Sequence, residues 1–290
     1  MNDYIILPFV YTLRPSLHRR FVMSNTSLFL ATAIEAVLRA GEIQLSYFGR
    51  DVRIEKKGVI DLVTEADLAV EEMFRDLINS RFPDHLVLAE EHHQTDSTID
   101  KPGFRWIFDP IDGTTNFAHN LPIFCSSLAL EISGRLEIAT VYDPTRRELF
   151  TAERGGGAFL NGIPMKVSLA EKLVDSVLCT GFPYDVHDTL DDVVSLFSQF
   201  TGQARAVRRL GSAALDLCYV ASGRLDGFWE QRLQAWDIAA GALLVEEAGG
   251  KISALSGGKF NVHAGEVLAS NGLIHDAMMT VIKTHAQALD

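Results

Sequence analysis

The sequence predicts a layered α/β or α+β fold in which helices cover the sheets. Apolar residues at three- and four-residue spacing mark amphipathic helices, and short apolar runs between them mark strands. In the second half of the chain these two kinds of segment alternate, as they do where sheets pack between helices. A chain of 290 residues is long for a single core, so one large domain or two fused subdomains are expected.

The first two helices are predicted from their apolar stripes. The first begins at Thr26, and the second begins at Thr64, which with Asp67 fits a capping box. A strand-like stretch at residues 52–57 separates them, and Pro83 follows the second helix. Their apolar stripes are Leu30, Ile34, Val37, Leu38, Leu45 and Phe48 in the first helix, and Leu68, Met73, Phe74, Leu77 and Ile78 in the second.

Two short apolar strands follow, and each runs into a carboxylate. Residues 85–89 lead into Glu90, and residues 105–108 lead into Asp109. Since α/β folds place ligands at the ends of sheet strands, these acids are the first indication of a site.

The rest of the chain shows β-like runs divided by turns, and then helices alternating with strands. Glycines at residues 155–157 and the pair Asn161-Gly162 are typical of turns and hairpins. The predicted strands are residues 124–132, 136–142, 148–152, 206–210, 225–229 and 267–269. The predicted helices are residues 191–200, 212–221 and 237–248.

Composition narrows the classes of protein. The net charge of −12 argues against a nucleic-acid partner, whose phosphates would be repelled. No apolar run is long enough to span a membrane, so no membrane association is expected. The widely spaced Cys125, Cys179 and Cys218 favour reduced, buried thiols in a cytoplasmic protein. Residues 1–22 place basic residues after an apolar run, the reverse of a secretory signal, so we expect a loose N-terminal extension or a natural start at Met23.

The segment around Asp109 and Asp112 is the strongest chemical feature. Pro110 and Gly113 are expected to force a turn that aims both carboxylates and the carbonyl of Ile111 at one point. Hard cations such as Mg²⁺ take such oxygen ligands, and carboxylates brought together need a proton or a metal between them. For this pair taken alone, a structural turn that caps a helix is the alternative.

Further acids make a purely structural explanation harder. Acids also stand at four other predicted element boundaries, namely Asp61, Asp67, Glu90 and Asp237. The sequence Gly113-Thr114-Thr115 begins a short helix, whose backbone amides suit a phosphate oxygen. Carboxylates for a metal beside amides for a phosphate form a site that can orient a phosphate ester and activate water against it.

Four motifs, in order, resemble the inositol monophosphatase family over residues 26–285. They are Asp61-Leu62-Val63-Thr64 with Asp67, Glu90-Glu91, Asp109-Pro110-Ile111-Asp112-Gly113-Thr114-Thr115-Asn116-Phe117, and Trp236-Asp237 with Ala239-Ala240-Gly241. The resemblance implies the αβαβα sandwich of the fructose-1,6-bisphosphatase superfamily, with a phosphatase domain at residues 23–290 and subdomains at residues 23–175 and 176–290. One departure is Ala89, since the family usually has glycine before the Glu pair.

The resemblance implies Mg²⁺ as the cofactor, with two to three ions per site and Mn²⁺ as an alternative. Glu90, Asp109 and the Ile111 carbonyl would hold the first ion. Asp109, Asp112 and Asp237 would hold the second, and Glu90 with waters would hold a third, weaker one.

The same resemblance implies the other roles in the site. Thr114 and Asp67 would position the attacking water and help to deprotonate it, with Glu90 as a further catalytic residue. The amides of Gly113 and Thr114 would bind phosphate. The implied substrate contacts are Asp112, Gly113, Thr114, Gly211, Ser212, Ala213 and Glu230, with Lys56, Asp61 and Arg208 as further candidates.

Structural alternatives stay open for several of these residues. Glu230 could instead be a solvent-facing acid at a strand end, and Arg208 and Arg209 could steer phosphate or cover the surface. The pair His92-His93 could indicate a transition metal, and the glycines at residues 155–157 could indicate a nucleotide loop.

The implied function is hydrolysis of a phosphate monoester of a small polyol by direct attack of metal-activated water. Inositol-1-phosphate is the leading substrate. Histidinol-phosphate phosphatase, fructose-1,6-bisphosphatase and 3′-phosphoadenosine-5′-phosphate phosphatase are the alternatives within the superfamily, and a non-catalytic metal-binding module is the alternative outside it. The implied partner is a small phosphorylated metabolite, and the implied protein is a cytoplasmic, lithium-sensitive homodimer.

Overall fold

The larger of two main sheets has seven strands in the computed structural model, which describes residues 25–50, 53–56, 62–92 and 103–289. Its strands follow one another in chain order, with β3 and β4 parallel and all other neighbours antiparallel. They are β3 (Leu86–Ala89), β4 (Phe104–Asp112), β5 (Cys125–Ile132), β6 (Arg135–Asp143), β7 (Glu148–Glu153), β8 (Gly157–Leu160) and β9 (Ile163–Pro164). The predicted Asn161-Gly162 hairpin joins the last two strands, and both of its residues have positive φ.

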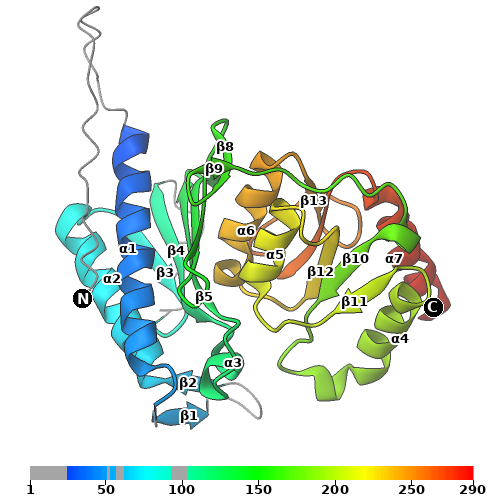
Figure 1. The fold of residues 1–290 in the computed structure, drawn as a ribbon, viewed down its shortest axis with the longest axis horizontal. Helices are drawn as coiled ribbons and strands as arrows, with labels where there is room; N and C mark the ends of the chain where they lie inside the picture. Colours follow the sequence, from blue (N-terminus) through cyan, green and yellow to red (C-terminus); the bar gives the residue numbers. More distant parts are fainter. Residues whose placement is uncertain (1–24, 51–52, 57–61, 93–102, 290) are drawn as a thin grey trace, which may run out of the picture.

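Two helices, α1 (Asn25–Tyr47) and α2 (Glu65–Arg81), cover the outer face of this sheet (Figure 1). The face of α1 toward the sheet consists largely of small residues, since Ala33, Ala36 and Ala40 are fully buried. A Cβ added to Gly41 would lie 2.5 Å from the ring of Tyr142 on β6. Small residues therefore let the helix axis approach the strands closely.

The predicted apolar stripes of these helices are wrong at three positions. Leu38 and Leu45 on α1 are 37% and 46% exposed, and Leu68 on α2 is 43% exposed. On α1, leucine spacing indicated the wrong edge of the stripe, because alanines and a glycine supply much of the packed face of that helix.

Helices α5 (Ala213–Ala221) and α6 (Ala235–Glu247) lie between the two main sheets (Figure 1). They too pack closely, because a Cβ on Gly241 would lie 2.5 Å from the side chain of Leu217. The largest apolar cluster surrounds these helices and contacts both sheets. Elements from distant parts of the chain thus meet at this central layer.

The second sheet has the strand order β11-β10-β12-β14-β13. Its strands are β10 (Val177–Thr180), β11 (Ala206–Arg208), β12 (Gly227–Gln231), β13 (Lys251–Ser253) and β14 (Glu266–Ser270). Helices α4 (Leu190–Thr201) and α7 (His275–Leu289) cover its outer face through a third apolar cluster. The five layers confirm the predicted αβαβα sandwich. Sequence patterns did not identify β10, β13 or α7.

Two smaller elements complete the part of the fold that borders the acidic residues. Strands β1 (Ile54–Lys56) and β2 (Leu62–Thr64) form an antiparallel pair before α2, and α3 (Thr114–Ala118) follows β4. The predicted extension at residues 1–22 lies outside the described residues. Within the described ranges, no helix is both long and apolar enough to cross a membrane.

Candidate metal centre and active site

Three acids from two layers of the fold converge on one point. Asp109 and Asp112 stand at the end of β4, and Asp237 stands in the first turn of α6. One carboxylate oxygen from each lies within 4.8 Å of the others, and this is the group of possible metal ligands found among the described residues. The structure therefore joins residues that are more than a hundred positions apart in the sequence.

Local backbone geometry presents these acids. The β4–β5 register shifts between Asp109 and Asp112, and the carbonyl of Pro110 accepts hydrogen bonds from Gln44 Nε2 at 2.7 Å and Ser126 Oγ at 2.9 Å. The chain turns only at Gly113, whose φ is +99°. The expected turn between the two acids is thus an irregular strand end, because the sheet and α1 both hold Pro110.

Asp237 occupies a different place from the one predicted. It was expected to begin α6, but the helix begins at Ala235, and Asp237 is its third residue. Its Oδ2 accepts the backbone N–H of Gln234 at 2.6 Å. One oxygen of Asp237 therefore takes part in the capping box at the start of α6.

Burial and mutual repulsion dominate the electrostatics of the cluster. Burial raises the pKa of Asp109 well above its ordinary value, and the charges of Glu90 and Asp112 raise it further. Burial and the charge of Asp112 likewise raise the pKa of Asp237. The Oδ1 atom of Asp109 is buried and accepts no hydrogen bond from the described residues. A buried oxygen of this kind among several acids fits a hard divalent cation, which would both ligate it and offset the repulsion.

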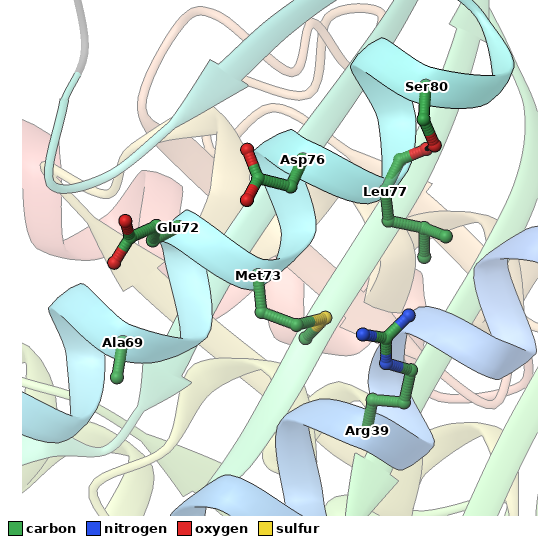
Figure 2. A pocket seen from close by; sticks show the side chains of 7 residues that line it. All are labelled: Arg39, Ala69, Glu72, Met73, Asp76, Leu77 and Ser80. Carbon is green, nitrogen blue, oxygen red and sulfur yellow. Dashed lines mark hydrogen bonds between the residues drawn. The ribbon is translucent and has the colours of Figure 1, made fainter.

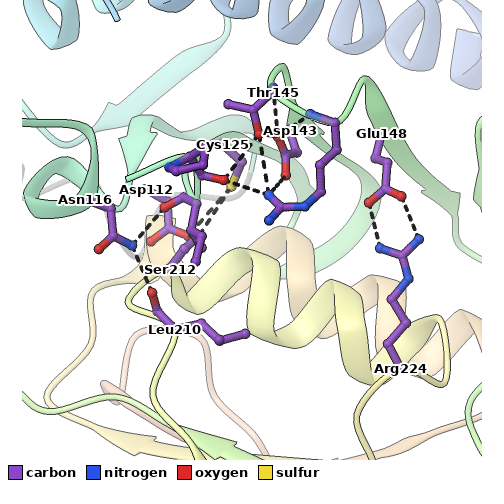
Figure 3. A network of polar contacts seen from close by, with 12 residues as sticks. Asp112, Asn116, Cys125, Asp143, Thr145, Glu148, Leu210, Ser212 and Arg224 are labelled. Atoms are coloured by element: carbon purple, nitrogen blue, oxygen red, sulfur yellow. Dashed lines mark hydrogen bonds and ion pairs between the residues drawn. The ribbon is translucent and has the colours of Figure 1, made fainter. Parts of the chain in front are cut away.

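Asp112 is also bound to the start of α5 (Figure 3). Its Oδ2 accepts hydrogen bonds from the Ser212 hydroxyl and, at 2.8 Å, from the Ala214 N–H, and Oδ1 accepts the Ala213 N–H at 3.2 Å. Burial raises the pKa of Asp112 to about 6, and these hydrogen bonds oppose the rise. The thiol of Cys125 lies 3.7 Å from the same Oδ2.

Asp67 and Thr114 meet beside the cluster. The predicted capping box is confirmed, since Asp67 Oδ2 accepts the Thr64 N–H at 2.8 Å and the Thr64 hydroxyl accepts the Ala66 N–H at 3.2 Å. The hydroxyl of Thr114 lies 3.4 Å from Asp67 Oδ1 and 2.9 Å from the Ile111 carbonyl oxygen. A hydroxyl between a carboxylate and a carbonyl is thereby held at the start of α3.

Glu230 lies inside the protein, which contradicts the alternative of a solvent-facing acid. It is 8% exposed on β12, and a Cβ on Gly181 would lie 2.1 Å from its carboxylate oxygens. Burial, with repulsion from Asp216, raises the pKa of Glu230 to about 8, and Arg209 opposes that rise. A buried acid thus stands on the second sheet near the start of α5.

Asn116 ties the segment around Gly211 to the short helix α3. Its Nδ2 donates to the carbonyls of Leu210 at 2.9 Å, Ile123 at 2.9 Å and Gly211 at 3.3 Å. Gly211 has a φ of +87°, and a Cβ there would lie 3.0 Å from the Asn116 side chain. The predicted substrate segment Gly211-Ser212-Ala213 therefore lies against the end of β4 and α3 (Figure 3).

Two further candidates, Lys56 and Arg208, do not belong to the cluster, and Asp61 lies outside the described residues. Lys56 is exposed on β1. Arg208 is exposed, and its only described side-chain hydrogen bond goes to the neighbouring Val207 carbonyl, at 3.2 Å. The guanidinium of Arg209 instead lies over the ring of Phe182, 5.5 Å from its centroid.

The alternative sites also find structural explanations. The N–H groups of Gly155 and Gly157 donate to the carboxylate of Glu247 at 2.9 and 3.0 Å, so the glycine turn holds a side chain where a nucleotide phosphate was considered. His92 is paired with Glu71, and no histidine belongs to the described ligand group. His93 lies outside the described residues. Cys125, Cys179 and Cys218 are buried and unbridged, as predicted.

A shallow hollow on the outer surface lies between α1 and α2, away from the acids (Figure 2). Arg39, Glu72, Asp76 and Ser80 give it a mixed charged lining around Met73 and Leu77. It shares no residue with the acidic cluster.

Three buried polar residues near the site were missed by sequence reasoning. They are Glu71, Asp216 and, apart from its place in a motif, Asn116. A signal for Glu71 did exist, because it lies four residues after Asp67 and so on the same face of α2. No local pattern distinguishes Asp216 from an ordinary surface acid of a helix.

The site is thus a buried set of carboxylates at a strand end beside a short helix, in an αβαβα sandwich, and one of its oxygens accepts no hydrogen bond from the described residues. Comparison with known proteins identifies the family. Residues 25–288 match the model of the inositol monophosphatase family. The chain is 44% identical to inositol-1-monophosphatase of Synechocystis over 92% of this chain and 93% of that protein. It is 41% identical to Nus factor SuhB of Pseudomonas aeruginosa, over 88% of this chain and 96% of that protein.

A solved structure gives the same result. Inositol monophosphatase from Anabaena (Nostoc) is 40% identical, with a TM-score of 0.81 over 90% of this chain and 97% of that one. The chain belongs to the inositol monophosphatase family. It is a phosphatase that hydrolyses phosphate monoesters.

Proposed function

We propose that this phosphatase converts inositol-1-phosphate to inositol and phosphate, with Mg²⁺ as its cofactor. The observation that carries the proposal is the buried Oδ1 of Asp109, which accepts no hydrogen bond from described residues, in a carboxylate that lies close to those of Asp112 and Asp237. The family of the chain and the name of its Synechocystis relative support the choice of substrate.

The proposed metal ligands are those that the family resemblance implies, and the convergence of Asp109, Asp112 and Asp237 supports them. Glu90, Asp109 and the Ile111 carbonyl would hold one ion, Asp109, Asp112 and Asp237 a second, and Glu90 a third. Their all-oxygen set favours Mg²⁺, with Mn²⁺ as a substitute. Bound metal supplies a lowered water pKa and neutralises negative charge on the phosphoryl oxygens.

The residues of the chain would divide the remaining work. The Thr114 hydroxyl, held between the Ile111 carbonyl and Asp67, would orient the attacking water, and Asp67 would take its proton. The amides of Gly113 and Thr114 would bind the phosphate. Glu230 would accept hydrogen bonds from the hydroxyls of the polyol. The segment Gly211-Ser212-Ala213 would contact the same substrate, and its position next to Asp112 supports that contact.

We also propose the organisation of the protein in the cell. The boundary between subdomains would fall near residue 175, between the strands of the two main sheets. The protein would act as a cytoplasmic homodimer sensitive to lithium, on the ground of family resemblance. Size-exclusion chromatography with light scattering tests the dimer, and a monomer at micromolar concentration would contradict it.

A substrate panel ranked by kcat/KM tests the proposed function. Inositol-1-phosphate should exceed histidinol phosphate, fructose-1,6-bisphosphate and 3′-phosphoadenosine-5′-phosphate in the presence of Mg²⁺. If one of these exceeds it about tenfold, which is about 1.4 kcal/mol of transition-state binding, the substrate assignment is wrong. If none is hydrolysed, the substrate is a different phosphate monoester and the assignment of inositol-1-phosphate is wrong.

A further inference from the structure

A fully buried acid of α2 holds the backbone directly after the proposed ligand Glu90. Oε2 of Glu71 accepts the Glu91 N–H at 2.7 Å, and Oε1 accepts the His92 N–H at 3.0 Å. The Nδ1 atom of His92 lies 3.1 Å from Oε1. Glu71 has no exposed surface. One buried carboxylate thus binds two consecutive backbone amides with its two oxygens.

Arg75, one helical turn further along α2, completes the arrangement. Its Nε donates to Glu71 Oε1 at 2.7 Å, and its Nη2 donates to the His92 carbonyl at 2.9 Å. The pair therefore binds both the N–H and the carbonyl of His92. The guanidinium thus bridges the buried carboxylate of Glu71 and the backbone carbonyl of His92.

These contacts restrain Glu90 from both sides. On one side, Ala89 is paired with Phe108 in the β3–β4 ladder. On the other, the N–H of Glu91 belongs to the same peptide unit as the Glu90 carbonyl, so its bond to Glu71 fixes that unit. Among the described residues β3 is an edge strand whose one neighbour is β4, and α2 supplies support on the loop that follows it.

We infer that Glu71 and Arg75 are positioning residues that aim the carboxylate of Glu90 into the metal centre. The inference rests on the proposed metal site. One face of α2 then serves the site twice, because Asp67 reaches Thr114 one turn before Glu71 reaches the Glu90 loop. Helix α2 therefore fixes the spacing between the pair of Asp67 and Thr114 and the proposed ligand Glu90.

The variant Glu71→Gln tests this with little change in volume. It replaces one acceptor oxygen by an NH₂ group, which then faces an N–H donor of the loop or Arg75. Glu247→Gln is the matched control, because Glu247 is also a helix carboxylate that accepts two backbone N–H groups, but in the remote turn of Gly155 and Gly157.

The experiment is isothermal titration of the substrate-free, full-length protein with Mg²⁺, combined with kcat at saturating Mg²⁺ and thermal unfolding. Glu71→Gln should weaken Mg²⁺ binding by about 10- to 100-fold, the usual effect of losing a group that orients a ligand. The Mg²⁺ concentration for half-maximal activity should rise by the same factor, while kcat at saturation recovers to within about threefold. Glu247→Gln should leave Mg²⁺ binding within about twofold of the wild type.

Arg75→Gln is the second variant, and it decides the matter if Glu71→Gln does not fold. It keeps Glu71 but removes the bond to the His92 carbonyl, so it should weaken Mg²⁺ binding in the same direction by about 3- to 10-fold. The inference is overturned if the folded variants bind Mg²⁺ as tightly as the wild type while losing only thermal stability. A wild type that binds no Mg²⁺ would instead overturn the proposed metal site, and this inference with it.

Discussion

The carboxylate of Asp112 accepts a 2.8 Å hydrogen bond from the backbone N–H of Ala214, which lies 102 residues later in the chain. With the bonds from Ser212 and Ala213, this makes a proposed metal ligand the acceptor for the first two backbone N–H groups of α5. The end of β4 and the start of α5 are therefore held together at the site, and changes at this junction should affect both metal binding and stability.

Ser212→Ala should show this double effect. Loss of the hydroxyl that donates to Asp112 should lower the free energy of unfolding by about 1 kcal/mol and weaken Mg²⁺ binding, because the carboxylate is less firmly oriented. Urea denaturation with and without Mg²⁺ measures both. Ser222→Ala is the control, since Ser222 lies just after the other end of α5 and its hydroxyl bonds only locally, to the Tyr219 carbonyl. Equal effects of the two variants would contradict the prediction.

Asp109→Asn should separate activity from folding. It should lower kcat more than about 100-fold, since losing a ligand costs more than losing its support. The apo protein should be as stable as the wild type or more so at neutral pH, because an acid whose pKa is raised by burial destabilises the fold when it ionises. Kinetics and calorimetry of the same preparation check this. Retained turnover would refute the proposed ligand.

Thr114 should depend on its hydroxyl. Thr114→Val keeps the shape but should reduce kcat by about 100-fold or more, whereas Thr114→Ser should stay within about tenfold of the wild type. Thr115→Val is a control at an exposed neighbour in the same short helix. If Thr114→Val and Thr114→Ser have similar kcat values, the hydroxyl does not orient the water.

Glu230 should make substrate affinity depend on pH. Burial raises the pKa of Glu230 to about 8, so the side chain is largely neutral at pH 7 and loses its proton as the pH rises through 8. A carboxylate accepts stronger hydrogen bonds from hydroxyls than the neutral acid does, so KM for inositol-1-phosphate should fall as pH rises toward 8. Glu230→Gln should remove this pH dependence with little change in kcat. A KM profile unchanged by the substitution would contradict the role.

His275 should govern part of the acid stability. It is buried between Ser253 and Ser270, and burial lowers its pKa to about 4. Because the folded pKa lies below the unfolded one, the stabilising contribution is complete above about pH 6.5 and is lost as pH falls toward 4. Up to about 3 kcal/mol is involved. In the variant His275→Asn the free energy of unfolding should depend less on pH over this range than in the wild type. The control is His187→Asn, since His187 is exposed.

The sequence by itself determined the layered fold class, the family motifs and the local devices. The capping box of Thr64 and Asp67 and the Asn161-Gly162 hairpin were predictable because each depends on residues a few positions apart. The acids could also be predicted as candidate metal ligands, since hard cations require oxygen ligands. Leucine spacing wrongly predicted that Leu38 and Leu45 are buried. The face of α1 that packs on the sheet instead includes Gly41, which lies against Tyr142.

Only the tertiary structure decided which groups meet. Sheet order and helix packing bring Asp237 to Asp109, bury Glu230, and fill the glycine turn with Glu247. The hydrogen bond from the Glu91 N–H to Glu71 likewise joins α2 to the end of β3. Such contacts link residues about 20 to 130 positions apart, and the burial that shifts their pKa values exists only after the layers have packed.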